Sequence, residues 1–212
     1  MTFALAARLI GEKGVREYVA AARQVKARHP DVRFLLLGGL DSNPSAIGKT
    51  EVASWVADGV VEWPGHVDMR PWLAKTSVFV LPSYREGLPR STQEAMVAGR
   101  PVISTDVPGC RETVVAGENG FLVPPRDVDS LAAAMLYFVD NPQQVAVMGR
   151  NSRRLAEQRF DVRAINEKML SVMGLDGTAS PEQADGSRAP RSQQAAPREE
   201  DDGGGAREQP LT

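Results

Sequence analysis

Two carboxylates stand in one short segment, residues 81–96, at a spacing that allows both to face one ligand. Glu86 and Glu94 are separated by seven residues. An apolar run ends at Leu81, a loop with one glycine and two prolines follows, and helix-forming residues begin near Ser91. We expect Glu86 on the loop and Glu94 one turn into the helix. Because the first N–H groups of a helix attract anions, the segment predicts an anion site flanked by two acids.

Two cations follow the first apolar run, residues 3–7. Arg8 comes directly after this run, and Lys13 precedes Gly14, which permits close backbone approach. Cations and helix N–H groups suit phosphates, whereas carboxylates accept paired hydrogen bonds from the vicinal hydroxyls of a ribose or a hexose. The combination therefore favours a nucleotide-sugar over a bare phosphate.

Each of these residues also has a purely structural interpretation. Ser91 and Glu94 have the spacing of a capping box, so Glu94 could serve only the helix start. Glu86 could be a solvated loop acid, and Arg8 and Lys13 could be surface charges. The occurrence of all four in this order favours a shared ligand site.

The elements that must position these residues alternate between apolar runs and amphipathic stretches. Strands are expected at residues 3–7, 32–37, 60–63, 77–81, 101–104 and 120–123. Helices are expected at residues 15–28, 48–58, 68–75, 91–98, 111–115, 128–139, 145–155 and 162–172. This order predicts an α/β fold, a single Rossmann-like doubly wound parallel sheet covered on both faces. Because ligands bind at the carboxyl ends of such strands, the loops of interest are 8–14, 38–47, 63–68, 82–91 and 105–110.

Two motifs imitate functional sites. Residues 43–50 end like a phosphate-binding P-loop, but Asn43 stands where the motif needs glycine and Pro44 removes one N–H group. We expect a plain loop there. Asp127 and Asp129 have the spacing of a metal-binding pair, but they open a helix, where an aspartate caps free N–H groups. We therefore predict no metal site and no cofactor, and the chain has no Gly-x-Gly-x-x-Gly dinucleotide motif.

Composition divides the chain into two parts. The last 37 residues, 176–212, hold eight acidic residues against four arginines and no aromatic, which leaves 21 basic and 19 acidic residues in 1–175. We expect 1–175 to be one nucleotide-sugar-binding domain, and 176–212 to be a disordered Gly/Pro/acidic tail that cannot offset its ordering entropy.

The same composition narrows the class of protein. No apolar run approaches 18 residues, and the start of the chain lacks a basic region followed by a secretory apolar run. Cys110 is the single cysteine, which suits a free thiol in a reducing compartment. Near-neutral charge argues against a nucleic-acid partner. We expect a cytoplasmic protein.

Five stretches of the chain together resemble the C-terminal donor-binding domain of retaining GT-B glycosyltransferases of family 4. They are residues 7–14, 82–96, 99–103, 106–112 and 119–123, and the resemblance extends over residues 3–174. Bacterial enzymes that add hexose or N-acetylhexosamine to lipid-linked or surface glycans are the most similar in kind. The implied reaction is glycosyl transfer with retention from a nucleotide-sugar, expected to be UDP-linked.

The resemblance also implies a role for each matching residue. Arg8 and Lys13 would hold the diphosphate, Glu86 would face the donor sugar, and Glu94 would bind ribose hydroxyls. The backbone of Gly87 and Leu88 would lie near the sugar, Arg90 and Ser91 near the phosphates, and His66 and Val67 near the base. His66 has a second interpretation, as a turn residue that contributes only its backbone.

A complete GT-B enzyme has an additional amino-terminal domain that binds the acceptor, and we expect this chain to contain only the donor half. The expected partners are a nucleotide-sugar donor, a glycan or lipid-linked acceptor and a separate amino-terminal acceptor domain, through which the protein would associate with the inner face of the membrane. Three hypotheses stay open: half of an enzyme, a UDP-binding module or truncated remnant without turnover, and an α/β regulator without a sugar ligand. The last helix, residues 162–172, is expected to expose part of its apolar stripe.

Overall fold

The computed structural model describes residues 1–175. Met1–Lys168 form one compact unit, and a second unit begins at Met169. The predicted tail, residues 176–212, lies outside the described residues, so the expected boundary at residue 175 stays a prediction. The site and the packing considered below belong to the first unit.

Six parallel strands form one sheet, in the order β3-β2-β1-β4-β5-β6. The strands are β1 (Thr2–Ala6), β2 (Arg33–Leu37), β3 (Glu62–Gly65), β4 (Val78–Leu81), β5 (Val102–Thr105) and β6 (Gly120–Val123). The order runs outward from β1 in one direction and from β4 in the other, which is the arrangement of a doubly wound sheet. The predicted fold class is confirmed.

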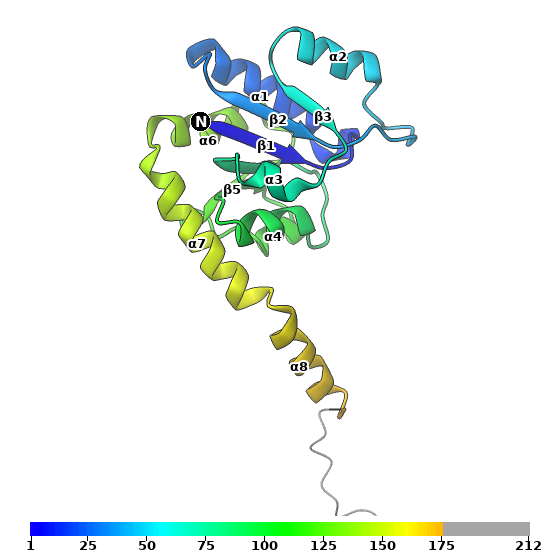
Figure 1. The fold of residues 1–212 in the computed structure, drawn as a ribbon, viewed down its shortest axis with the longest axis vertical. Coiled ribbons are helices and arrows are strands. Elements are labelled where there is room, and N and C mark those ends of the chain that lie inside the picture. The colour runs from blue at the N-terminus through cyan, green and yellow to red at the C-terminus, as the bar shows by residue number, and fades with distance from the viewer. Residues whose placement is uncertain (176–212) are drawn as a thin grey trace, which may run out of the picture. The chain divides into compact units, whose positions relative to one another are not determined.

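Helices cover both faces of this sheet because its strands are apolar on both sides. They are α1 (Val15–Arg28), α2 (Lys49–Ala57), α3 (Met69–Leu73), α4 (Arg90–Val97), α5 (Pro108–Arg111), α6 (Val128–Asp140), α7 (Gln143–Arg159) and α8 (Val162–Val172), with a short 3-10 turn η1 (Gly11–Lys13). Alternate residues of β4 show the division. Val78 and Val80 pack with α1 and α6, whereas Phe79 and Leu81 pack with α3, α4 and α7. Figure 1 shows α1 and α4 on opposite sides of the sheet.

Several predicted boundaries differ from the structure, and two of these differences have a clear physical reason. The third strand begins at Glu62 instead of residue 60, because the N–H groups of Val60 and Val61 donate to the Trp55 carbonyl at the end of α2. Both valines are buried, which explains their apolar pattern without strand pairing. Helix α5 spans Pro108–Arg111 instead of residues 111–115, since Pro108 at its first position fixes the helical φ early.

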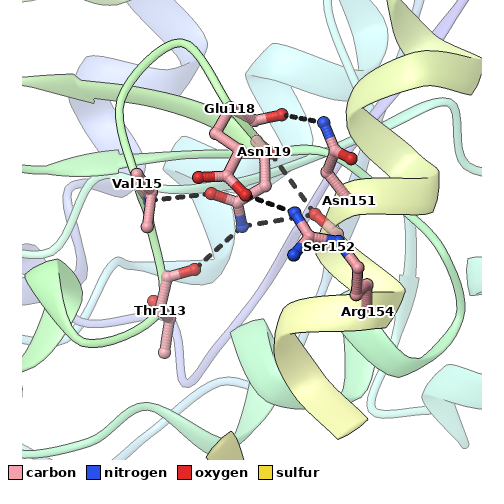
Figure 2. A network of polar contacts seen from close by, with 7 residues as sticks. All are labelled: Thr113, Val115, Glu118, Asn119, Asn151, Ser152 and Arg154. Carbon is pink, nitrogen blue, oxygen red and sulfur yellow. Dashed lines mark hydrogen bonds and ion pairs between the residues drawn. The ribbon is translucent and has the colours of Figure 1, made fainter. Parts of the chain in front are cut away.

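A buried polar network fixes the loop before β6 onto α7 (Figure 2). The Asn119 side chain is fully buried; its amide donates to the Thr113 carbonyl at 3.0 Å and to Ser152 Oγ at 3.3 Å, and its oxygen accepts from the Val115 N–H at 2.7 Å. At the more exposed edge of the network, Arg154 and Glu118 form an ion pair, with 2.5 Å between Arg154 Nη2 and Glu118 Oε1. Every strong donor and acceptor of the Asn119 amide group is occupied by the protein itself, so the network serves the fold.

Helix α8 is amphipathic but has no buried residue. Val162, Met169 and Val172 are among its exposed apolar side chains, as the sequence predicted. Among residues 1–175, no helix combines the length and apolar character needed to cross a bilayer.

Candidate functional site

The predicted site residues converge where the strand order reverses, between β1 and β4. The loop after β1 and the loop after β4 leave the sheet at the same edge, since the two strands are parallel neighbours. The N–H group of Tyr84 donates to the Glu12 carbonyl at 2.9 Å and ties the two loops together. This carboxyl-end crevice is where doubly wound sheets bind ligands.

Lys13 and Glu86 meet across these two loops. Lys13 Nζ lies 2.6 Å from Glu86 Oε1, and the two side chains are 21% and 12% exposed. A charge-assisted hydrogen bond of this length, largely out of solvent, is stronger than a surface ion pair. The sequence predicted both residues for the site but not their direct contact. The ion pair with Lys13 and the low exposure of Glu86 exclude the interpretation of Glu86 as a merely solvated loop acid.

Arg8 has a partner that sequence reasoning missed. Its Nη1 lies 3.3 Å from Asp41 Oδ2 in the loop after β2, and Arg8 is 66% exposed. One of the five guanidinium N–H groups is used in this contact, so most of the donor capacity of Arg8 stays open. Loop 38–47 was among the loops of interest, and Asp41 is the acid in it.

A pocket of about 750 Å³ opens beside this region. Six predicted site residues line it: Arg8, His66, Val67, Arg90, Ser91 and Glu94. Four others do not line it: Lys13, Glu86, Gly87 and Leu88. The structure thus separates a pocket at the amino-terminal end of α4 from the neighbouring Lys13–Glu86 pair.

Glycine backbone also lines the pocket, within a loop of interest in which sequence reasoning gave neither glycine a role in the site. Gly38 and Gly39 follow β2, and Met69 opens α3. A Cβ atom on Gly38 would lie 1.9 Å from the Ala7 carbonyl oxygen, so a side chain has no room there. The pair Gly38-Gly39 after a buried strand is a signal that could have identified this part of the pocket lining.

Helix α4 begins two residues earlier than the capping-box interpretation requires, since a cap at Ser91 would start the helix at residue 92. Pro89 is its N-cap residue, no side chain caps the helix, and Ser91 lies inside the first turn. The capping-box role for Ser91 and Glu94 is therefore wrong. Since the first N–H groups of an α-helix have no intrahelical acceptor, those of α4 can receive an anion.

Gly109 packs closely against the backbone of the loop that carries Glu86. A Cβ atom on Gly109 would lie 2.1 Å from the Gly87 carbonyl oxygen and 2.4 Å from that of Glu86. The adjacent Cys110 is fully buried, and burial raises the pKa of its thiol. A buried thiol with a raised pKa is a poor nucleophile, so Cys110 contributes packing under the site.

The two imitating motifs have structural roles. In loop 41–47, the N–H groups of Asn43 and Ser45 donate to side chains of the same loop, which leaves no phosphate cradle. Asp127 caps α6 and accepts from the Ser130 N–H at 2.9 Å, as predicted. Within the described part of the chain, no cluster of three or more His, Cys, Asp or Glu residues is placed to hold a metal ion.

The arrangement can bind a specific kind of molecule. Arg8, Arg90 and the start of α4 supply positive charge and donors to an anion, and Glu94 supplies acceptors to hydroxyl groups in the same pocket. Lys13 and Glu86 place a second cation and carboxylate at the adjacent loop pair. A ligand with phosphates between two hydroxyl-bearing rings matches this order of charges.

Comparisons with known proteins place the chain in a family. A family described as "Glycosyl transferases group 1" matches residues 2–141. WcaL of Salmonella typhimurium, named for colanic acid biosynthesis, is 33% identical over 184 residues, 79% of this chain and 43% of the relative. An N,N'-diacetylbacillosaminyl-diphospho-undecaprenol alpha-1,3-N-acetylgalactosaminyltransferase of Campylobacter jejuni is 28% identical over 78% of this chain and 42% of the relative.

Solved structures agree with these relatives. Alr3699/HepE of Anabaena, crystallised with UDP, has a TM-score of 0.74 at 26% identity and covers 82% of this chain. Sucrose-phosphate synthase of Thermosynechococcus elongatus has a TM-score of 0.72 at 29% identity over 82% of this chain. The chain spans less than half the length of each of these proteins. It belongs to the group 1 glycosyltransferases and has the fold of the C-terminal domain of a GT-B enzyme.

Proposed function

We propose that this chain binds the nucleotide-sugar donor, a UDP-sugar, of a retaining glycosyltransferase. The observation that carries the proposal is the pocket at the amino-terminal end of α4, which Arg8, Arg90 and Glu94 line together. The acceptor would bind to an amino-terminal half, in accord with the length of the relatives. The transferred group would be a hexose or an N-acetylhexosamine.

In this proposal the diphosphate lies at the start of α4. Arg8 holds one side of it, and Lys13 reaches it from the adjacent loop. Negative charge grows on the diphosphate as the bond to the sugar breaks, so cations fixed in advance stabilise the transition state. Arg90 and Ser91 contribute from the first turn of the helix.

The two carboxylates hold the two rings of the donor. Glu94, which lines the pocket, accepts hydrogen bonds from the ribose hydroxyls. Glu86, held by Lys13, faces the sugar, with the backbone of Gly87 and Leu88 beside it. His66 and Val67 approach the base. Retention would come from attack of the acceptor hydroxyl on the same face that the diphosphate leaves.

The relatives support the choice of donor and acceptor. HepE was crystallised with UDP and with UDP-glucose. The Campylobacter jejuni relative is named for transfer to a diphospho-undecaprenol-linked sugar. A lipid-linked acceptor of this kind would bring the assembled enzyme to the inner face of the membrane, with the acceptor half in contact with the lipid.

The donor half is tested by ligand binding. We expect UDP, UDP-glucose or UDP-N-acetylglucosamine to raise the melting temperature of the chain, because a ligand that binds only the folded state stabilises it. ADP and NAD serve as matched controls with the same diphosphate. Calorimetry on Glu94→Ala should then show weaker UDP binding by about tenfold. Equal stabilisation by UDP, ADP and NAD, or none by any, would remove the proposal.

A second candidate is a UDP-binding module without turnover, since the residues that line the pocket could hold a nucleotide whether or not a sugar is transferred. Both candidates bind UDP, but only the half-enzyme takes part in transfer of the sugar. An assay for release of UDP from a UDP-sugar separates them. It is run first with the chain alone, and then with the chain, the amino-terminal half of a relative and an undecaprenyl-diphosphate sugar as acceptor. Turnover only in the combined mixture supports the half-enzyme, and binding without turnover in both supports the module.

A further inference from the structure

Tyr84 stands two residues before Glu86 and is held by three elements outside its own loop. Its N–H group donates to the Glu12 carbonyl at 2.9 Å, and its hydroxyl donates to Glu17 Oε1 of α1 at 2.5 Å. The Arg126 guanidinium lies 4.4 Å from the centre of its ring. The proposed roles of the site residues leave Tyr84 without a function.

The partners of Tyr84 carry two unusual features of their own. Glu17 Oε2 is buried and has no hydrogen-bond partner. Among the described residues, Arg126 is the one non-glycine residue with a positive φ, at 64°. The left-handed conformation is disfavoured for a residue with a Cβ atom, so surrounding contacts must maintain it. The other oxygen of Glu17, Oε1, accepts the Tyr84 hydroxyl, and the Arg126 guanidinium lies over the Tyr84 ring, so both unusual residues contact Tyr84.

The hydroxyl of Tyr84 acts as a hydrogen-bond donor in this cluster. Burial, followed by the hydrogen bond to the Glu17 carboxylate, raises the pKa of Tyr84 above its ordinary value. A tyrosine is protonated at neutral pH even at that ordinary value of about 10, so the phenol has its proton to donate. Its hydrogen bond to a carboxylate is charge-assisted. A cation–π contact with the Arg126 guanidinium restrains the ring of Tyr84, and the hydrogen bond to Glu17 restrains its hydroxyl.

We propose that Tyr84 is a positioning residue that, through Glu17 and Arg126, fixes the loop so that Glu86 faces the donor sugar. The inference rests on the proposed function, in which Glu86 contacts the sugar and not the nucleotide. Tyr84 anchors the loop before Glu86, Gly109 supports it at Glu86 and Gly87, and Lys13 holds the carboxylate itself at 2.6 Å. The carboxylate is thereby placed before the ligand arrives, which lowers the ordering cost of binding.

Tyr84→Phe tests this by removing one hydroxyl while keeping the ring. We measure dissociation constants by calorimetry for UDP and for the tighter of UDP-glucose and UDP-N-acetylglucosamine. Affinity for UDP should stay within twofold of the wild type. The ratio of the UDP-sugar constant to the UDP constant should rise about fivefold, since loss of one charge-assisted hydrogen bond misplaces Glu86. General destabilisation of the domain would move both constants together.

Two comparisons make the test specific. Tyr137→Phe is the matched control and should leave the ratio unchanged, because the Tyr137 ring on α6 packs against Phe121 of β6 and Phe138 of α6. In a Glu86→Gln background, Tyr84→Phe should change the ratio no further, because the two residues act on one contact. Hydrogen exchange at residues 83–88 should become faster in Tyr84→Phe while exchange in β4 stays constant.

The outcomes separate this inference from the proposed function. A wild-type chain that binds neither UDP nor a UDP-sugar removes the proposed function and, with it, the sugar-facing role of Glu86. Binding by the wild type with a constant ratio in Tyr84→Phe, or with unchanged exchange at residues 83–88, overturns the inference alone. A raised ratio that persists in the Glu86→Gln background also overturns it.

Discussion

Two polar clusters each join a loop to a neighbouring segment: the network around Asn119, and the ion pairs in the loops that follow β1 and β4. They differ in how much hydrogen-bonding capacity is left for a ligand. Asn119 is fully buried, and its amide oxygen and both amide hydrogens are taken by protein groups (Figure 2). Arg8 is largely exposed beside a pocket and uses one N–H group on Asp41. Saturated polar groups specify a structure, whereas unsaturated ones next to a pocket are available to a ligand.

The Lys13–Glu86 pair stands between these two cases. It is mostly out of solvent like Asn119, yet each member has further hydrogen-bonding capacity, since an ammonium has three donors and a carboxylate has four lone-pair sites. The pair can therefore keep its mutual contact and still receive a ligand on both sides. This distinction between saturated and open polar clusters makes four predictions, which differ in whether stability or binding changes.

Asn119→Ala should have the largest effect, and it should be on stability. The substitution leaves the Thr113 carbonyl and the Val115 N–H without their partner, and the Ser152 hydroxyl keeps only its hydrogen bond to the Asn119 backbone carbonyl. We expect the free energy of unfolding in urea to fall by about 3 kcal/mol, since each buried unpaired group is costly. Asn141→Ala, which removes an exposed side-chain hydrogen bond to Tyr137, is the control and should cost far less. Weaker UDP binding by the folded variant would contradict the assignment of this network to structure.

Arg8→Ala and Lys13→Ala should show the opposite pattern. We expect UDP affinity to fall ten- to a hundredfold in calorimetric titrations, as each variant loses a charged hydrogen bond to the diphosphate. The unfolding free energy of Arg8→Ala should hardly change, because its ion pair is mostly solvated. Arg23→Ala breaks a comparable surface pair with Asp58 and should leave UDP affinity unaltered. Unchanged affinity in both site variants would show that these cations are surface charges.

Gly109→Ala should affect binding through the backbone of the Glu86 loop. The added methyl group would collide with the carbonyl oxygens of Glu86 and Gly87, so the loop must move away from α5. We expect about a fivefold loss of UDP-sugar affinity, comparable with the loss of one positioned hydrogen bond. Gly48→Ala is a suitable control, because no atom lies within 4 Å of the added Cβ. Equal losses in both variants would mean that the contact under Glu86 is unimportant.

The sequence predicted the elements and the edge of the sheet more fully than it predicted side-chain partners. Alternating apolar runs were sufficient for the doubly wound sheet, and strand direction placed Arg8, Lys13 and Glu86 at one edge. The partners themselves were not predicted. Lys13 and Glu86 are 73 positions apart in the chain, so their contact depends on the paths of two loops, which no local pattern encodes.

The same limit applies to Asp41 and to the start of β3. Asp41 is 33 positions from Arg8, and its role appears only once loop 38–47 is placed beside the loop after β1. Val60 and Val61 have strand-like side chains, but their N–H groups were already committed to α2. In contrast, the Asp127 cap was predicted correctly, because its Ser130 partner is three residues away and helix geometry alone brings them together.

Asp127 gives the last and smallest prediction, since its carboxylate imitates a metal ligand but accepts two hydrogen bonds from Ser130 at the start of α6. Hydrogen bonds from the Ser130 hydroxyl and then the Ser130 N–H hold the pKa of the Asp127 carboxyl below its usual range. A lowered pKa means that ionised Asp127 stabilises the fold above its unfolded-state pKa of about 4, and that this contribution is lost as pH falls through the folded-state value.

Asp127→Asn keeps a capping oxygen but removes the charge. The variant should therefore be slightly less stable than the wild type at pH 6, and the difference in unfolding free energy should shrink steadily as urea titrations are repeated toward pH 3.5. Ser130→Ala should narrow the difference at pH 6 in the same way, because it removes the donor that lowers the pKa. A difference that is constant with pH would mean that the charge of Asp127 contributes nothing to the cap. Added Mg²⁺ should alter neither curve, whereas a metal ligand would respond to it.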